Sequence, residues 1–192
     1  MLDDDDRRIL GRIALESLAA ALAKRPYEPA ATAKPALLEK RGCFVTLKKG
    51  GELRGCLGCF TSEKPLYLSV ATYARHSALE DPRFEGRRLA SADLPFIEVE
   101  ISALTPLTPC PSPESVVLGR HGIYVSKGGR SGCFLPQVAS ETNWSVEEFW
   151  GHCCRDKAGL DWNAWRDPGT MVMTFEAEAF NAQIPDAHGA KS

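Results

Sequence analysis

The sequence has no run of apolar residues long enough to cross a membrane and no excess of positive charge. A membrane-spanning helix needs about 20 predominantly apolar residues in a row, and no segment of the 192 residues approaches that length. The formal net charge is −2 and the pI is about 6.1, so the chain lacks the basic field that attracts nucleic acids and acidic membranes. We therefore expect neither a membrane protein nor a nucleic-acid-binding protein.

The opening stretch MLDDDDRR is acidic and lacks the apolar region of a secretory signal. A cytoplasmic protein is therefore expected, in which most cysteines stay reduced. The odd number of cysteines, seven, also argues against a complete disulfide framework. With 44% hydrophobic residues, the chain can bury a substantial core as a single domain over residues 1–182. We expect residues 183–192 to be a disordered tail.

The hydrophobic pattern changes between helical and strand periods along the chain. Helices are predicted from Asp3–Asp6 to Leu22, from Pro65 to the residue before Asp81, and from Ser145 to Gly159. Strands are predicted at residues 43–47, 52–57, 95–104, 122–126, 132–135 and about 170–180. Hairpins interspersed with helices predict an α+β fold with a largely antiparallel sheet and helices packed on it. The proline-rich stretch at residues 105–113 is a candidate boundary between two lobes.

The most informative segment is LRGCLG, residues 53–58, which places a cysteine between two glycines. Gly55 and Gly58 allow close backbone approach and positive φ, and the backbone N–H groups beside them could form an oxyanion hole. Arg54 could bind an anion or favour a thiolate. Cys56 is expected where the second strand gives way to a turn at Gly58, and it is the candidate nucleophile. The alternative is a small residue packed at a tight turn.

Cys56 and Cys59 also form a CxxC pair, which raises two further interpretations. A thioredoxin-like redox pair opens a helix after a strand, whereas this pair follows a hairpin. A zinc site would need completion by His152, Cys153 and Cys154, but a second CxxC is absent. Consecutive residues of a helix also point in different directions. We therefore predict no metal ion and no cofactor.

Three further residues are candidates for a site. His121, in GRHGIYV, lies between a turn and a strand and could act as the general base for the cysteine; the alternative is a turn histidine without a catalytic role. Arg83, in DPRF, could clamp a carboxylate or phosphate, or form a structural ion pair with Asp81 or Glu85. The amide of Gln137, in FLPQV, could bind a ligand or cap a loop.

These segments together resemble the AMMECR-one domain family. The resemblance rests on LRGCLG, PLYLSV, DPRF, IEVEISALTP, GRHGIYV, FLPQVA and HCCRDKAGL, which occur in the family's order over about residues 41–180. It implies a compact, two-lobed α+β domain with its active site at the LRGC(I/L)G motif. In many prokaryotes such proteins are the A component of the AmmeMemoRadiSam set, so a Memo-like protein and a radical SAM enzyme are the implied partners.

Two hypotheses of function follow. In the first, the protein is an enzyme in which Cys56 is a covalent nucleophile, His121 is the base, and Arg54 or Arg83 binds an anionic group of a small-molecule or modified-peptide substrate. In the second, it is a non-catalytic adaptor that binds a ligand or a protein, and Cys56 merely fits a tight turn.

Overall fold

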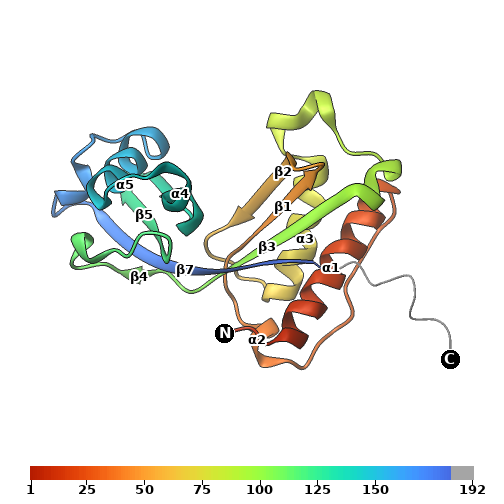
Figure 1. Cartoon of the computed structure of the whole chain (residues 1–192). Coiled ribbons are helices and arrows are strands. Elements are labelled where there is room, and N and C mark those ends of the chain that lie inside the picture. Colours follow the sequence, from red (N-terminus) through yellow and green to blue (C-terminus); the bar gives the residue numbers. More distant parts are fainter. Residues whose placement is uncertain (183–192) are drawn as a thin grey trace. The chain divides into compact units, whose positions relative to one another are not determined.

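The structure is a computed structural model that describes residues 1–182. The described residues form two compact units (Figure 1). The first unit is Met1–Ala103 together with the described residues from Glu178 onward, and the second is Leu104–Ala177. The first unit thus ends next to the predicted lobe boundary at residues 105–113. The predicted disordered tail lies outside the described residues.

The first unit contains three antiparallel strands, joined at one edge by the last residues of strand β7 (Met171–Asn181), with two long helices on one face of this sheet (Figure 1). Its helices are α1 (Asp4–Leu22), α2 (Pro35–Leu38) and α3 (Leu66–Leu79), and its strands are β1 (Cys43–Lys49), β2 (Glu52–Cys59) and β3 (Ile97–Leu104). The strand order is β2-β1-β3-β7. Two 3₁₀ turns, Pro82–Arg87 and Ser91–Phe96, connect α3 to β3.

The core of the first unit lies between this sheet and the helices α1 and α3. Along β1, the side chains of Cys43, Val45 and Leu47 are completely buried in that core. Phe44 and Thr46, which alternate with them, are only half-buried. Because successive side chains of a strand point to opposite faces, Phe44 and Thr46 lie on the face of the sheet turned away from the helices.

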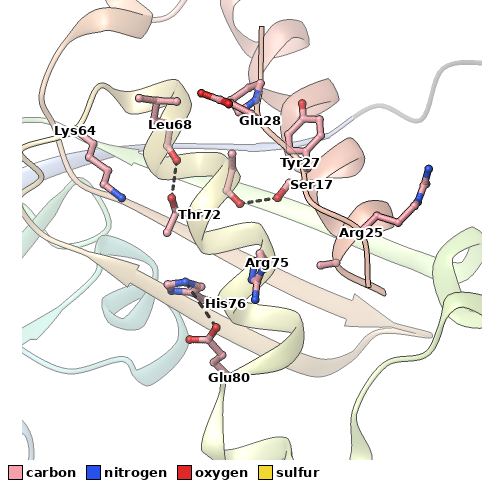
Figure 2. A pocket seen from close by; sticks show the side chains of 13 residues that line it. Ser17, Arg25, Tyr27, Glu28, Lys64, Leu68, Thr72, Arg75, His76 and Glu80 are labelled. Atoms are coloured by element: carbon pink, nitrogen blue, oxygen red, sulfur yellow. Dashed lines mark hydrogen bonds and ion pairs between the residues drawn. The ribbon is translucent and has the colours of Figure 1, made fainter. Parts of the chain in front are cut away.

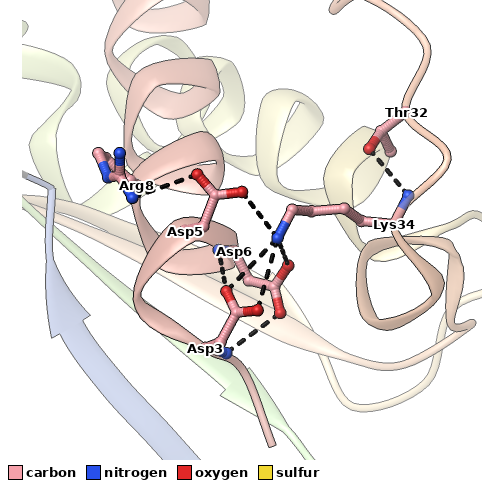
Figure 3. A network of polar contacts seen from close by, with 6 residues as sticks. All are labelled: Asp3, Asp5, Asp6, Arg8, Thr32 and Lys34. Atoms are coloured by element: carbon pink, nitrogen blue, oxygen red, sulfur yellow. Dashed lines mark hydrogen bonds and ion pairs between the residues drawn. The ribbon is translucent and has the colours of Figure 1, made fainter.

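A polar network joins the start of α1 to the extended segment that precedes α2 (Figure 3). Asp3 and Asp6 form a reciprocal capping box at the helix N-terminus. Lys34 Nζ lies 2.7 Å from a carboxylate oxygen of Asp5 and 3.1 Å from one of Asp6. These hydrogen bonds raise the pKa of Lys34. The acidic start of the helix, predicted from the sequence, thus also anchors the segment at residues 25–34.

The second unit is built on the long strand β7. Its elements are β4 (Thr108–Pro109), β5 (His121–Lys127), β6 (Arg130–Phe134), α4 (Pro136–Thr142), α5 (Val146–His152) with a π-helical extension (Cys153–Lys157), and β7 (Met171–Asn181). β7 pairs with β4 and β5, and β6 pairs with β5, all antiparallel. Ser145 and Glu148 form the predicted capping box of α5. The last residues of β7 belong to the first unit, where the Ala182 N–H donates to Val99.

The predicted α+β class with a largely antiparallel sheet is confirmed. The helices α2 and α4 were not predicted, because at four and seven residues they are too short to show an amphipathic period. Each begins with proline in its first turn, which is the only local signal for them. None of the helices in the described part of the chain has the length and apolarity needed to span a bilayer.

The predicted hairpin of β1 and β2 is present and turns through Gly50 and Gly51, at φ of 58° and 77°. The prediction for its second strand was wrong in one respect. β2 does not end before a turn at Gly58 but continues to Cys59, and neither Gly55 nor Gly58 has a positive φ. These two glycines therefore serve close packing and not a turn.

A β-bulge interrupts the pairing of the two strands. Lys48 lies opposite Leu53, but the next residue of β1, Leu47, lies opposite Gly55. Arg54 is therefore the extra residue of β2 and has no partner in β1. A bulge of this kind shifts the register of every later pair by one residue.

The bulge decides which face of the sheet carries Cys56. Without it, continued pairing from the turn would place Cys56 opposite Val45, whose side chain is buried in the core. With it, Cys56 lies opposite Thr46, on the face turned away from the helices. A one-residue shift exchanges the two faces of a strand, so the bulge exposes the cysteine.

Ser77 of α3 maintains this geometry. Its hydroxyl donates to the Val45 carbonyl at 2.7 Å and accepts from the Leu57 N–H at 2.9 Å, so it bridges the two strands beside the bulge. Its backbone carbonyl lies so close to Gly55 that a Cβ built there would be 2.0 Å from the oxygen. Only glycine lets α3 approach the strand this closely.

We expect Gly55→Ala to lower the free energy of unfolding by about 1–3 kcal/mol, because the added methyl must displace α3 from β2. Gly86→Ala is the matched control, since a Cβ at Gly86 meets no atom within 4 Å, and its effect should stay within about 0.5 kcal/mol. Urea unfolding of both variants measures the difference. Equal stabilities would show that the close approach of Ser77 carries no constraint.

A candidate active site around Cys56

The thiol of Cys56 is half-buried on the face of the sheet turned away from α1 and α3. The hydroxyl of Thr46, its partner across the hairpin, donates a hydrogen bond to the sulfur at 3.2 Å. The side chain therefore has one polar neighbour from the adjacent strand and remains accessible.

The backbone of Cys56 is held on both sides by the segment that follows α3. The Cys56 N–H donates to Asp81 Oδ2 at 2.9 Å, and the Cys56 carbonyl accepts from Arg83 Nη2 at 3.0 Å. Asp81 is completely buried and also accepts from the Arg83 backbone N–H at 3.1 Å. Its position as the residue before a helical turn explains this contact.

Asp81 and Arg83 form a two-point ion pair. Arg83 Nε donates to Oδ1 at 2.9 Å, and Nη2 donates to Oδ2 at 2.6 Å. The guanidinium hydrogen bond lowers the pKa of Asp81 to about 2, although burial acts in the opposite direction. Asp81 in turn raises the pKa of Arg83, and the Cys56 side chain acts in the same direction. Arg83 is thus held in place by Asp81 with its charge beside the Cys56 sulfur.

Part of the Arg83 guanidinium remains available. Its side chain is 55% exposed. Its Nη1 makes no hydrogen bond to any of residues 1–182. A guanidinium fixed by a carboxylate, with free N–H donors, is suited to bind a carboxylate, a phosphate or an oxyanion. The ion pair with Asp81, given as the structural alternative for Arg83, is present, but it leaves these donors free.

Arg54, the other predicted anion-binding residue, has different contacts. Its guanidinium donates to Glu52 at 2.7 Å and to the Leu53 carbonyl at 3.1 Å. As the extra residue of the bulge, Arg54 is turned back along its own strand. The cation beside the cysteine is therefore Arg83.

Backbone N–H groups that were predicted to form an oxyanion hole already have hydrogen-bond partners within the protein. The N–H of Cys56 is bonded to Asp81, and the N–H of Leu57 is bonded to Ser77. The two amides that adjoin the cysteine between Gly55 and Gly58 are therefore engaged within the protein. Among the described groups around Cys56, the side chain of Arg83 is therefore the one with N–H donors left for an anion.

Cys56 and Cys59 do not form a CxxC pair in space. They lie three residues apart in a strand, so their side chains point to opposite faces, and Cys59 lies opposite the buried Cys43. Cys153 and Cys154 of the second unit are completely buried, and burial raises the pKa of both thiols. Among the residues that the structure describes, no group of three or more His, Cys, Asp or Glu could hold a metal ion.

His121 and Gln137 lie in the second unit. The pairing of His121 with Cys56 stays a prediction, and so does ligand binding by the Gln137 amide. His121 Nδ1 accepts from the Val117 N–H at 3.1 Å, and Nε2 lies 3.9 Å from a Glu176 carboxylate oxygen. The neutral ring therefore carries its proton on Nε2. Gln137 does not cap a loop through its carbonyl oxygen, which is buried without a hydrogen-bond partner among the described residues.

Two residues of this site, Thr46 and Ser77, were not predicted from the sequence, and neither was the contact of Asp81 with the Cys56 backbone. Thr46 could not be assigned, because its pairing with Cys56 depends on the bulge. Ser77 contacts the motif only through the packing of α3. Asp81 carried a usable signal, since an Asp before Pro at the start of a helical turn is a typical capping residue.

These features describe an α+β protein of two units in which a bulged strand presents a cysteine between two glycines. The sequence profile of the AMMECR1 family matches residues 11–180. The chain is 42% identical to Protein MK0488 of Methanopyrus kandleri over 158 residues, 78% of this chain and 75% of that protein. It is 36% identical to Protein NEQ441 of Nanoarchaeum equitans over 178 residues, 89% of this chain and 97% of that protein. The chain belongs to the AMMECR1 family.

A solved structure agrees with this assignment. The crystal structure of uncharacterized protein PH0010 from Pyrococcus horikoshii matches with a TM-score of 0.84 and 36% sequence identity, covering 96% of this chain and 95% of that one. The family resemblance predicted from the sequence is thereby confirmed.

The Asp81–Arg83 pair should make stability depend on pH in the acid range. The pKa of Asp81 falls from 3.8 to about 2 on folding, so its contribution of about 2 kcal/mol is present above pH 3.8 and is lost as the pH falls towards 2. We expect Asp81→Asn to lower the free energy of unfolding at neutral pH, and its difference from the wild type to shrink below about pH 4.

Asp156→Asn is the control, because Asp156 also pairs with an arginine but is solvent-exposed, and such pairs contribute little. Denaturant unfolding of the three proteins across this pH range provides the measurement. A difference between Asp81→Asn and wild type that stays constant with pH would contradict the assigned role.

Proposed function

We propose that this AMMECR1-family protein is an enzyme in which the Cys56 thiolate attacks an activated carbonyl of a small-molecule or modified-peptide substrate. One observation carries the proposal. The accessible Cys56 sulfur has the Thr46 hydroxyl at 3.2 Å and the Arg83 guanidinium beside it, and Asp81 holds both the arginine and the cysteine backbone. A sulfur with a hydroxyl donor and a fixed cation is the arrangement of a reactive cysteine.

The proposed reaction proceeds in two steps. The thiolate forms a bond to the carbonyl carbon while the carbonyl electron pair moves to oxygen, and Arg83 Nη1 stabilises that oxyanion. The carbonyl re-forms as the leaving group departs with its bonding electrons and takes a proton from solvent, which leaves a thioester on Cys56. Water then attacks the carbonyl carbon of the thioester, the C–S bond breaks with its electron pair going to sulfur, and the sulfur takes up a proton lost by the water, which releases the acid and the free Cys56 thiol.

Selective alkylation tests the state of the thiol. With less than one equivalent of iodoacetamide at about pH 7, we expect Cys56 to react first, and Arg83→Met to slow its reaction about threefold or more because the neighbouring positive charge is lost. Cys133 is a useful internal reference, since it is also half-buried and burial raises the pKa of its thiol to about 11. Peptide mass spectrometry locates and quantifies the label.

Cys59→Ser is the matched control and should leave the labelling rate of Cys56 unchanged, because its side chain lies on the other face of β2. Preferential labelling of Cys59 or Cys133, or an equal rate for Cys56 in Arg83→Met, would overturn the reactive-thiol assignment. Far-UV circular dichroism of each variant separates loss of fold from loss of reactivity.

The adaptor hypothesis remains the second candidate, and one observation favours it. Most polar groups around Cys56 already have partners within the protein, since Asp81 and Arg83 bond to the Cys56 backbone as well as to each other. The site therefore has a structural role independent of chemistry. In this case the family resemblance supports a Memo-like protein and a radical SAM enzyme as the proposed partners.

Cys56→Ser separates the two functions in a host that encodes both partner types. We expect the variant to fold and to copurify with the same partners as the wild type, but to fail to restore the phenotype of a deletion strain, because serine is a weaker nucleophile. Quantitative mass spectrometry of tagged proteins and complementation provide the two readouts. Full complementation by Cys56→Ser would rule out the cysteine enzyme and favour the adaptor.

A further inference from the structure

A groove runs between α1 and α3 on the side of α3 that does not face the sheet. It consists of two adjoining cavities of about 480 and 470 Å³, which share Ala21, Arg25 and Arg75 in their walls. Figure 2 shows the first cavity, with Thr72, Arg75 and His76 along α3, Lys64 in the segment that precedes α3, and the segment of Tyr27 and Glu28 across from them. Each cavity has the volume of a small-ligand site, so the pair accommodates an extended ligand.

The α1–α3 groove carries unpaired positive charge. Four cations line it: Lys24, Arg25, Lys64 and Arg75. None of them makes a side-chain hydrogen bond or ion pair with residues 1–182. The chain as a whole is acidic, with a formal net charge of −2, and most of its exposed arginines and lysines elsewhere are paired with carboxylates. A local excess of unpaired cations in a recessed surface favours an anionic ligand.

The floor of the groove is apolar. It is formed by aliphatic side chains, namely Ala21, Leu22, Leu68, Ala71, Leu79 and Leu89. Tyr27, which also lines the groove, has its hydroxyl bonded to Glu16 at 2.8 Å. The ligand must therefore bury apolar groups as well as present negative charge.

We propose that the α1–α3 groove binds an acidic, partly apolar peptide segment of another protein. Carboxylates of the segment would pair with Lys64 and Arg75, while Arg25, whose guanidinium extends outward in Figure 2, lies at the rim. Aliphatic side chains of the segment would occupy the floor. Alternating acidic and apolar side chains of a peptide match this pattern.

Two features favour a peptide over a nucleic acid or a membrane surface. Glu28 and Glu80 lie among the cations of the groove, and these carboxylates would repel a continuous row of phosphates. The lining contains no Phe or Trp, and its two aromatic rings, Tyr27 and His76, are engaged with Glu16 and with Tyr73 and Glu80, so it offers no row of free rings on which bases could stack. A peptide can instead present backbone N–H groups to the two glutamates.

Selection from a random library of peptides of about 12 residues, displayed on phage and panned against the full chain, tests the proposal. We expect the selected peptides to be enriched in Asp and Glu interspersed with Leu, Ile, Val or Phe. Fluorescence anisotropy with a selected peptide should show about tenfold or more weaker binding for Lys64→Glu/Arg75→Glu, and weaker binding to wild type at higher ionic strength.

Arg8→Glu/Lys40→Glu is the matched control, because it makes the same change in charge in the first unit at two exposed residues outside the groove. Its affinity should stay within about twofold of wild type. Thermal melting verifies that both double variants are folded.

Three outcomes would overturn the proposal: no enrichment of acidic peptides, equal loss of affinity in both double variants, or binding of an oligonucleotide or of anionic phospholipid vesicles in place of peptide. Loss of Cys56 reactivity has no bearing on it, since the groove and the cysteine lie on different sides of α3.

Discussion

The position of the Cys56 thiol depends on a single register shift between two strands. The bulge at Arg54 moves the cysteine from the core face of the sheet to the opposite face, and the contact of Ser77 with Gly55 holds the bulge in place. A one-residue slip reverses every later side chain of a strand, so a small local irregularity decides between a buried and an accessible sulfur. The two glycines of the motif serve packing and not a turn, because helix α3 and the ring of Phe44 need the space where their side chains would lie.

Helix α3 connects most of the features described for the first unit. Its inner side carries Ser77, which bridges the strands at the bulge. The residues directly after its end include Asp81, which fixes the Cys56 backbone and the Arg83 guanidinium. Its outer side carries Arg75 and one wall of the α1–α3 groove. A displacement of this one helix would therefore act on the cysteine and on the groove together.

Much of this architecture was predictable because it follows from local patterns. The two-glycine turn, the capping box of Ser145 and the helical period of α1 and α3 all lie within short segments of sequence. The bulge was not predictable, because it depends on Ser77, which is distant from the hairpin along the chain. The bulge also turns Arg54 away from Cys56, so that Arg83 is the cation beside the cysteine. Which of the two arginines lies there could therefore not be predicted either. The motif singled out Cys56, and Arg83 was a candidate from its own segment, whereas Thr46 and Ser77 were not predicted.

The order β2-β1-β3 leaves β2 as an edge strand of its unit, with one row of backbone groups not paired to another strand. At Cys56 these groups are already occupied, since the Asp81 carboxylate accepts the N–H and the Arg83 guanidinium donates to the carbonyl. A carboxylate and a guanidinium thus take the place that a neighbouring strand would fill. Exposed edges promote association between sheets. The pair of side chains that positions the cysteine therefore also protects this part of the sheet from pairing with another chain.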